Sequence, residues 1–146
     1  MCLISTNHDK TCRTTPAEFS SPNYPRYYPN YANEDLIINI PSWAHLVIKI
    51  LAFDLPSWYS WLKFIQVNPS DASMVSVTKN GQEVSNFFNN KYCGWASYPK
   101  ALQVNSEYEI RGAESIKIEF RSDSLVTRSG FLIEYTMVLN EISTFG

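Results

Sequence analysis

The residues of this sequence that could perform chemistry are few: three cysteines (Cys2, Cys12 and Cys93) and two histidines (His8 and His45). A serine or cysteine nucleophile needs a base positioned beside it. His45 falls in a turn after a predicted strand, where we expect it on the surface, and His8 falls in a polar N-terminal region. The motifs Gly-x-Ser-x-Gly and His-Glu-x-x-His do not occur in the sequence. The sequence therefore predicts no catalytic residues, and we expect a protein that is not an enzyme.

Metal chemistry has equally little support in the residue spacing. No two cysteines form a Cys-x-x-Cys pair, and the histidines do not complete a zinc pattern. Asp54 and Asp123 could be read as paired carboxylates, but aspartates at strand ends are usually solvated. The odd number of cysteines leaves at least one thiol without a partner in the chain. We expect no cofactor.

A more promising feature is the aromatic segment at residues 55–61, which carries Trp58, Tyr59 and Trp61 beside Pro and Ser. Exposed aromatic side chains mark contact sites, because they offer a large area at low entropic cost. The alternative is that these rings fold inward and fill the core, since Trp is usually highly buried. Both interpretations stay open at the level of the sequence.

Other aromatic residues lie near turns. The tyrosines 24, 27, 28 and 31 could form a binding face, but we expect at least Tyr24 and Tyr28 to belong to the framework. Trp95 and Tyr98 are expected to pack within their own loop.

The elements that position these residues must form one globular domain. The chain has 146 residues, 45% of them hydrophobic and 18% charged, with a formal net charge of -2. That composition suits one folded core and does not favour a nucleic-acid partner. No apolar run reaches the length that a membrane span needs. Residues 1–18 are polar and aperiodic, so we expect an irregular arm there.

Apolar and polar residues alternate along several short stretches, as in half-buried β-strands. The alternation is strictest around Ile118 and Ile133, and Asn80-Gly81 is a strong hairpin signal. No window sustains a helical period, although a short helix could lie at 86–91. The predicted strands lie at residues 36–40, 46–50, 62–67, 74–78, 82–87, 116–121 and 131–135. This pattern predicts an all-β sandwich or barrel.

Three landmarks follow one another along the chain. They are Ser-Pro-Asn-Tyr-Pro at 21–25 with Tyr-Pro-Asn at 28–30, Tyr-Cys-Gly at 92–94, and Phe-Arg-Ser-Asp at 120–123 with Gly-Phe at 130–131. In this order the sequence resembles CUB domains. The resemblance implies a jelly-roll-like β-sandwich of two antiparallel sheets, with the domain at residues 19–139, the arm at 1–18 and a C-terminal tail at 140–146.

The resemblance also implies a function. CUB domains are secreted or ectodomain modules, so we expect a secreted, extracellular, non-catalytic module that recognises a protein. Two alternatives remain: an adhesin-like lectin that binds a glycan, or a non-catalytic module of an extracellular protease. Neither nucleic-acid binding nor membrane insertion is expected.

The cysteines depart from the family pattern, which usually has two disulfides. The family partner of Cys93 would fall near Ser60, and the second cysteine of the first pair near Leu36. Cys2 and Cys12 could pair across a short loop, or Cys12 could be a remnant of the first pair. Cys93, without its family partner, could link two chains into a homodimer.

The calcium ligands of the family are also largely missing. The family's glutamate falls at about Pro56 and its first aspartate at about Lys63, so only Asp123 survives. Calcium prefers several oxygen ligands, most of them charged. We therefore expect no metal, with Asp123 a ligand only if calcium is retained, and Lys63 could pair with Asp123 in place of the ion. The predicted contact surface comprises Trp58, Tyr59, Trp61, Lys63 and Asp123.

Overall fold

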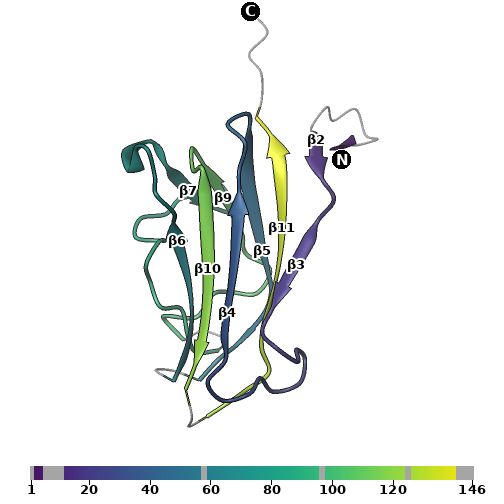
Figure 1. Cartoon of the computed structure of the whole chain (residues 1–146), viewed down its shortest axis with the longest axis vertical. Helices are drawn as coiled ribbons and strands as arrows, with labels where there is room; N and C mark the ends of the chain where they lie inside the picture. The colour runs from purple at the N-terminus through teal and green to yellow at the C-terminus, as the bar shows by residue number, and fades with distance from the viewer. Residues whose placement is uncertain (1, 5–11, 57–58, 96–97, 124–125, 141–146) are drawn as a thin grey trace, which may run out of the picture.

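The computed structural model describes residues 2–4, 12–56, 59–95, 98–123 and 126–140. Almost all of its regular structure is β-strand (Figure 1). The elements are β1 Cys2–Ile4, β2 Cys12–Thr14, β3 Ala17–Ser20, β4 Asn33–Asn39, β5 Ala44–Asp54, β6 Ser60–Gln66, the 3-10 turn η1 Ala72–Met74, β7 Ser76–Lys79, β8 Gln82–Glu83, β9 Glu107–Arg111, β10 Ser115–Ser122 and β11 Gly130–Leu139.

The strands form two antiparallel sheets. The larger has eight strands in the order β1-β2-β11-β5-β9-β7-β8, with β3 also paired to β11. The smaller has three strands in the order β4-β10-β6 and lies in front of the larger one in Figure 1. The expected all-β sandwich of two antiparallel sheets is confirmed.

The hydrophobic core lies between the sheets because alternate residues of each strand point inward. In the small sheet, Ile116, Ile118 and Phe120 of β10 are fully buried, while Lys117, Glu119 and Arg121 face outward. In the large sheet, Ile48 of β5 and Ile133 of β11 are likewise fully buried. These alternating apolar positions are the ones that predicted the strands.

Tyr28 connects the segment before β4 to this core. Its side chain is 1% exposed, and its ring meets Phe120 edge-on at 5.0 Å. Its hydroxyl donates a hydrogen bond to Ser60 Oγ. The expectation that Tyr28 is framework agrees with this burial, and Tyr24 is half-buried.

The N-terminal region differs from the sequence-based expectation. Residues 1–18, expected to be irregular, contain β1, β2 and the start of β3. β3 pairs with β11 through Glu18 opposite Glu134, and Arg13 of β2 lies opposite Val138. The strand conformation of β2 and β3 therefore depends on pairing with residues more than a hundred positions away, which local periodicity does not reveal, whereas β1 pairs with the nearby β2.

Four other segments differ from what the sequence suggests. Residues 72–74 form the 3-10 turn η1, so the predicted strand at 74–78 begins only at Ser76. After the Asn80-Gly81 hairpin, β8 stops at Glu83 instead of reaching residue 87. No helix forms at 86–91. Strand β9 was not predicted at all, because Tyr108 and Ile110 are its only two apolar residues.

Candidate functional site

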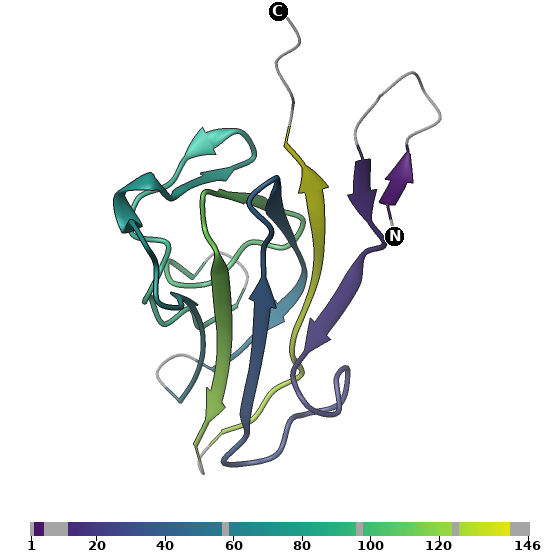
Figure 2. The same cartoon turned by 45° about the horizontal axis from the view of Figure 1, so that its top comes forward.

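The exposed aromatic side chains of the described residues gather at one end of the sandwich. Four of the five belong to loops at this end: Tyr27 (65% exposed), Tyr31 (73%), Tyr59 (40%) and Trp95 (45%). Three loops carry them: the loop before β4, the β5–β6 loop and the loop after Tyr92. The β10–β11 loop lies at the same end. We call these four loops the loop end; they lie in the lower part of Figure 1, and in Figure 2 the start of β4 and the end of β10 mark this end at the bottom.

Backbone hydrogen bonds connect these four loops. The Tyr31 N–H donates to the carbonyl oxygen of Asp123 at 3.1 Å, and the Asp123 N–H donates to that of Tyr59 at 3.1 Å. The Leu55 N–H donates to Gly94, which ties the β5–β6 loop to the loop of Trp95. The exposed tyrosines 31 and 59 therefore flank Asp123 on a connected surface.

Beside the loop end, three cationic groups surround the ring of Trp61, the second residue of β6. Lys63 Nζ lies 4.8 Å from the ring centroid, Lys91 Nζ 5.1 Å and Arg121 Cζ 5.9 Å. Trp61 and Lys63 point to the outer face of the small sheet, opposite Arg121 and Glu119 respectively. Cations are attracted to an aromatic face at such distances. We call Trp61, Lys63, Lys91 and Arg121 the Trp61 cluster.

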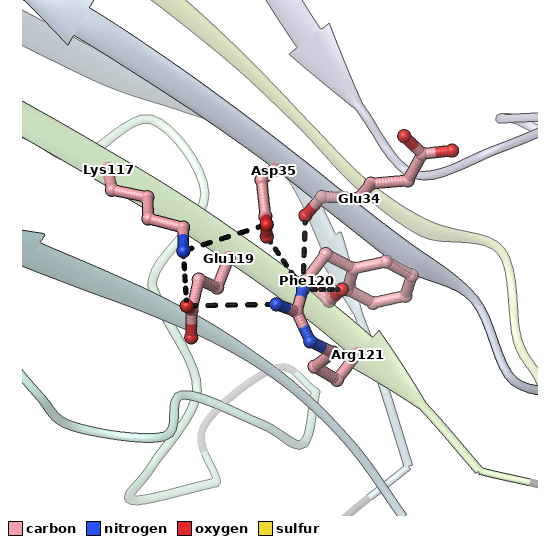
Figure 3. A network of polar contacts seen from close by, with 6 residues as sticks. All are labelled: Glu34, Asp35, Lys117, Glu119, Phe120 and Arg121. Carbon is pink, nitrogen blue, oxygen red and sulfur yellow. Dashed lines mark hydrogen bonds and ion pairs between the residues drawn. The ribbon is translucent and has the colours of Figure 1, made fainter.

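A network of ion pairs continues along the same face (Figure 3). Arg121 pairs with Asp35 at 2.7 Å and with Glu119 at 3.7 Å, and Lys117 pairs with the same two carboxylates at 3.7 and 3.0 Å. The hydrogen bond from Arg121 holds the pKa of Asp35 below its usual value. Hydrogen bonding to Glu119 raises the pKa of Lys117. Both carboxylates are thus engaged by Lys117 and Arg121.

The structure brings together the described members of the predicted contact surface. Tyr59 is exposed, Trp61 and Lys63 are partly exposed, and Asp123 is bonded to Tyr59 through its backbone. Trp58 lies outside the described residues. Tyr59 and Trp61 are not buried, so the alternative that these rings only fill the core does not hold for them.

The family's calcium positions do not fit a cation here. Pro56 is buried and offers no charged oxygen, and the ammonium group of Lys63 stands over the Trp61 ring. No group of three Asp, Glu, His or Cys residues within the described ranges could hold a metal ion. Asp123 is thus the only carboxylate at the three aligned positions. The suggested ion pair between Lys63 and Asp123 stays a prediction.

A second cation–aromatic contact lies at the loop end. Arg128 Cζ is 5.0 Å from the Trp95 ring, and its Nε donates to Asp54 Oδ1 at 2.6 Å. Trp95 and Tyr98 stack with centroids 6.0 Å apart, as expected for rings that pack within one loop. Trp95 nevertheless remains 45% exposed. Asp54 is therefore a partner of Arg128 and is not half of a carboxylate pair.

Sequence reasoning missed Lys91, Arg121 and Arg128 as members of the candidate site. Lys91 and Trp61 are thirty positions apart, and Arg121 joins them only through the β10–β6 pairing. No spacing rule relates these residues. The cross-strand alignment of the Phe-Arg-Ser-Asp landmark with β6 could have suggested Arg121 alone.

The outer face of the large sheet is hollowed. A concavity of about 550 Å³ is lined by residues of β2, β5, β9 and β11, including Arg13, Lys49, Glu109 and Glu134. His45 lies in it and is 5% exposed, so the expectation of a surface histidine was wrong. His45 pairs in register with Val138 of β11, and its Nδ1 lies 2.9 Å from Asn140 Oδ1, so neighbouring strands cover it.

The cysteines are only partly described. Cys93 is a free thiol and 3% exposed. Its burial argues against the expected link between two chains, because a partner's thiol cannot reach it. The β1–β2 register sets Cys2 opposite Thr14 and Cys12 opposite Ile4, so the two cysteines are not direct cross-strand neighbours. Their disulfide stays a prediction.

Comparison with known proteins identifies the fold family. The model of the CUB domain family matches residues 8–135. The chain therefore belongs to the CUB domain family, as the three landmarks predicted. CUB domains occur in extracellular proteins and are generally protein-interaction modules.

Solved structures agree with this fold. The CUB1-EGF-CUB2 domain of human MASP-1/3 matches with a TM-score of 0.64 and 18% identity, covering 87% of this chain and 43% of that one. The full extracellular region of zebrafish Gpr126/Adgrg6 matches with a TM-score of 0.57 and 23% identity, covering 87% and 14%. The MASP-1 CUB2 domain bound to Ca²⁺ matches with a TM-score of 0.52 and 18% identity, covering 84% and 92%.

The chain spans less than half the length of the human MASP-1/3 fragment and of the zebrafish region. Within the described ranges, no helix is long and apolar enough to cross a membrane.

Proposed function

We propose that this CUB domain is a secreted, non-catalytic recognition module that binds a partner protein through the loop end and the neighbouring Trp61 cluster. One observation carries the proposal: four of the five exposed aromatic side chains of the described residues gather there. Aromatic residues dominate the energetics of protein interfaces because they bury a large area with few torsions to freeze. The general role of the family as an interaction module supports the same conclusion.

Two features of the loop end favour a protein partner. The loops are joined by backbone hydrogen bonds through Asp123, so little ordering is needed on binding. Trp95 and Arg128 extend the aromatic surface with a charged group at its rim. A core of aromatic residues with charges at the edge is the usual composition of such interfaces.

The glycan alternative has less support at Trp61. A sugar ring needs a free aromatic face on which to stack, and cationic groups already lie within 6 Å of the Trp61 ring. The other alternative, a non-catalytic module of an extracellular protease, is compatible with the loop-end proposal. It concerns the protein to which the domain belongs and not the surface through which the domain binds.

The test is a binding screen of the labelled chain against cell surfaces and secreted proteins. Tyr31→Ala combined with Tyr59→Ala should lower binding at least tenfold without lowering the melting temperature, because both side chains are exposed. Trp43→Ala is the matched control: Trp43 is 63% exposed and lies in the β4–β5 turn at the opposite end. Equal binding by the double variant and the control would reject the loop end as the contact surface.

A further inference from the structure

The outer face of the small sheet carries more positive than negative charge, although the whole chain has a net charge of -2. Among the residues of β4, β6 and β10 together with Lys91, the cations on this face are Lys63, Lys91, Lys117 and Arg121, and the carboxylates are Asp35 and Glu119. Four positive charges against two negative ones leave a surplus of two. This local charge is opposite in sign to that of the protein.

The surplus is concentrated at Trp61. Asp35 and Glu119 each pair with both Lys117 and Arg121, so these four charges neutralise one another. Lys63 and Lys91 form no ion pair with any described carboxylate. Both ammonium groups lie against the same aromatic ring, at 4.8 and 5.1 Å from its centroid, and this contact restricts both side chains before any ligand arrives.

We propose that Lys63 and Lys91 bind carboxylate side chains in an acidic segment of a partner protein. Two ordered ammonium groups that no carboxylate of the described ranges neutralises complement a pair of neighbouring carboxylates. Ile65, half-buried on the outer face of β6, and exposed Tyr59 lie along the same strand and loop, where they supply apolar contact for the flanking residues. This inference rests on the proposed recognition function and specifies the chemistry of its partner.

The confinement of the surplus charge favours a short acidic peptide segment over a sulfated polysaccharide. A polyanion with charge along its whole length gains affinity from a long cationic track. On this face the next cations in line, Arg121 and Lys117, are already paired with Asp35 and Glu119. We therefore expect the negative charge of the ligand to be confined to a short segment.

The experiment is an NMR titration of the full chain with short capped peptides, following the indole N–H signal of Trp61. The probes are Leu-Glu-Glu-Leu, its glutamine and lysine counterparts, and a heparin tetrasaccharide. We expect that, of the four probes, only the glutamate peptide shifts this signal. The affinity of the protein for this peptide should fall as the salt concentration is raised. Lys63→Gln combined with Lys91→Gln should weaken binding about tenfold, which is about 1.4 kcal/mol.

Lys79→Gln combined with Lys100→Gln is the matched control, because it removes the same charge from the chain outside the Trp61 cluster. Glutamate-peptide binding that is equal in the two double variants would overturn the inference. Preference for the lysine peptide or for the heparin fragment would overturn it as well.

The two proposals fail separately. If the Lys63/Lys91 variant still binds the partners found in the screen while the Tyr31/Tyr59 variant does not, the loop end stands and the acidic ligand is rejected. If the Tyr31/Tyr59 variant binds as the wild type does, the loop end itself is rejected.

Discussion

The hydroxyl of Tyr28 donates a 2.7 Å hydrogen bond to Ser60 Oγ in the buried interior. Tyr28 is 1% exposed and Ser60 fully buried. The family resemblance puts the disulfide partner of Cys93 near Ser60. A hydrogen bond thus occupies the region where a CUB domain usually has a covalent link, and it joins the segment before β4 to the start of β6.

This pair predicts an asymmetric response to mutation. Ser60→Ala removes the acceptor and leaves the Tyr28 hydroxyl buried without a partner, which should cost about 1–3 kcal/mol of unfolding free energy. Tyr28→Phe should cost about 1 kcal/mol, because the serine hydroxyl that is left can rotate to another acceptor more freely than the phenol hydroxyl, which stays near the plane of its ring. In the double variant the two losses should overlap by about 1 kcal/mol in denaturant unfolding. Strict additivity would show that the hydrogen bond adds no stability.

Much of the sandwich could be predicted from local periodicity, because each long strand buries only one of its two faces. In β10 and β11 the inward side chains are apolar and the outward ones polar over a long stretch, so the period of two is unmistakable. β9 has the same period over five residues only, and β2 and β3 depend on pairing with β11. Short strands stabilised by distant partners carry too little local signal.

The candidate site was predictable only where its residues are contiguous in sequence. Tyr59, Trp61 and Lys63 lie within five positions near the start of β6, and the aromatic segment there predicted a contact surface. Lys91 reaches the same ring from a different loop. Tyr31 joins the surface through the carbonyl oxygen of Asp123. Such neighbours are created by the fold, so only a structure reveals them.

Substitution of Gly130, the first residue of β11, is predicted to destabilise the fold. Its φ is +93°, and a Cβ atom there would overlap Ser21 Oγ and lie 3.2 Å from Tyr28 Cδ2. Gly81, with φ of +87°, has no heavy atom within 4 Å of the same position, so Gly81→Ala isolates the backbone strain. Gly130→Ala should therefore be less stable than Gly81→Ala by at least about 2 kcal/mol in thermal unfolding. Equal losses would mean that Ser21 moves aside freely.

Cys93 is predicted to be unreactive in the native protein. Its thiol is 3% exposed, and its backbone N–H is bonded to Lys100. In a chain with Cys2→Ser and Cys12→Ser, a thiol reagent should label Cys93 only on unfolding, and non-reducing gels should show a monomer. Denaturant supplies the control, since labelling there must be complete. Rapid native labelling or a disulfide-linked dimer would contradict the burial of this thiol.

Buried tyrosines predict a loss of stability at alkaline pH. Burial raises the pKa of Tyr92 to about 12 and also raises the pKa values of Tyr28 and Tyr108. In the unfolded chain a tyrosine ionises near pH 10, so folding favours the neutral phenol. This stability is fully present below about pH 10 and is lost as the pH rises toward 12, by about 2 kcal/mol from Tyr92 alone. Denaturant titrations across this range, with tyrosinate absorbance, would measure it.

Tyr92→Phe tests the origin of that alkaline loss. The variant removes the hydrogen bond from the Tyr92 hydroxyl to the Phe87 carbonyl, 3.0 Å long, so it should be about 1 kcal/mol less stable at neutral pH. Its stability should then fall less steeply than that of the wild type above pH 10, because one buried phenol no longer resists ionisation. Tyr31→Phe, at a side chain 73% exposed, is the matched control. An unchanged alkaline slope in Tyr92→Phe would assign the loss to Tyr28 and Tyr108 instead.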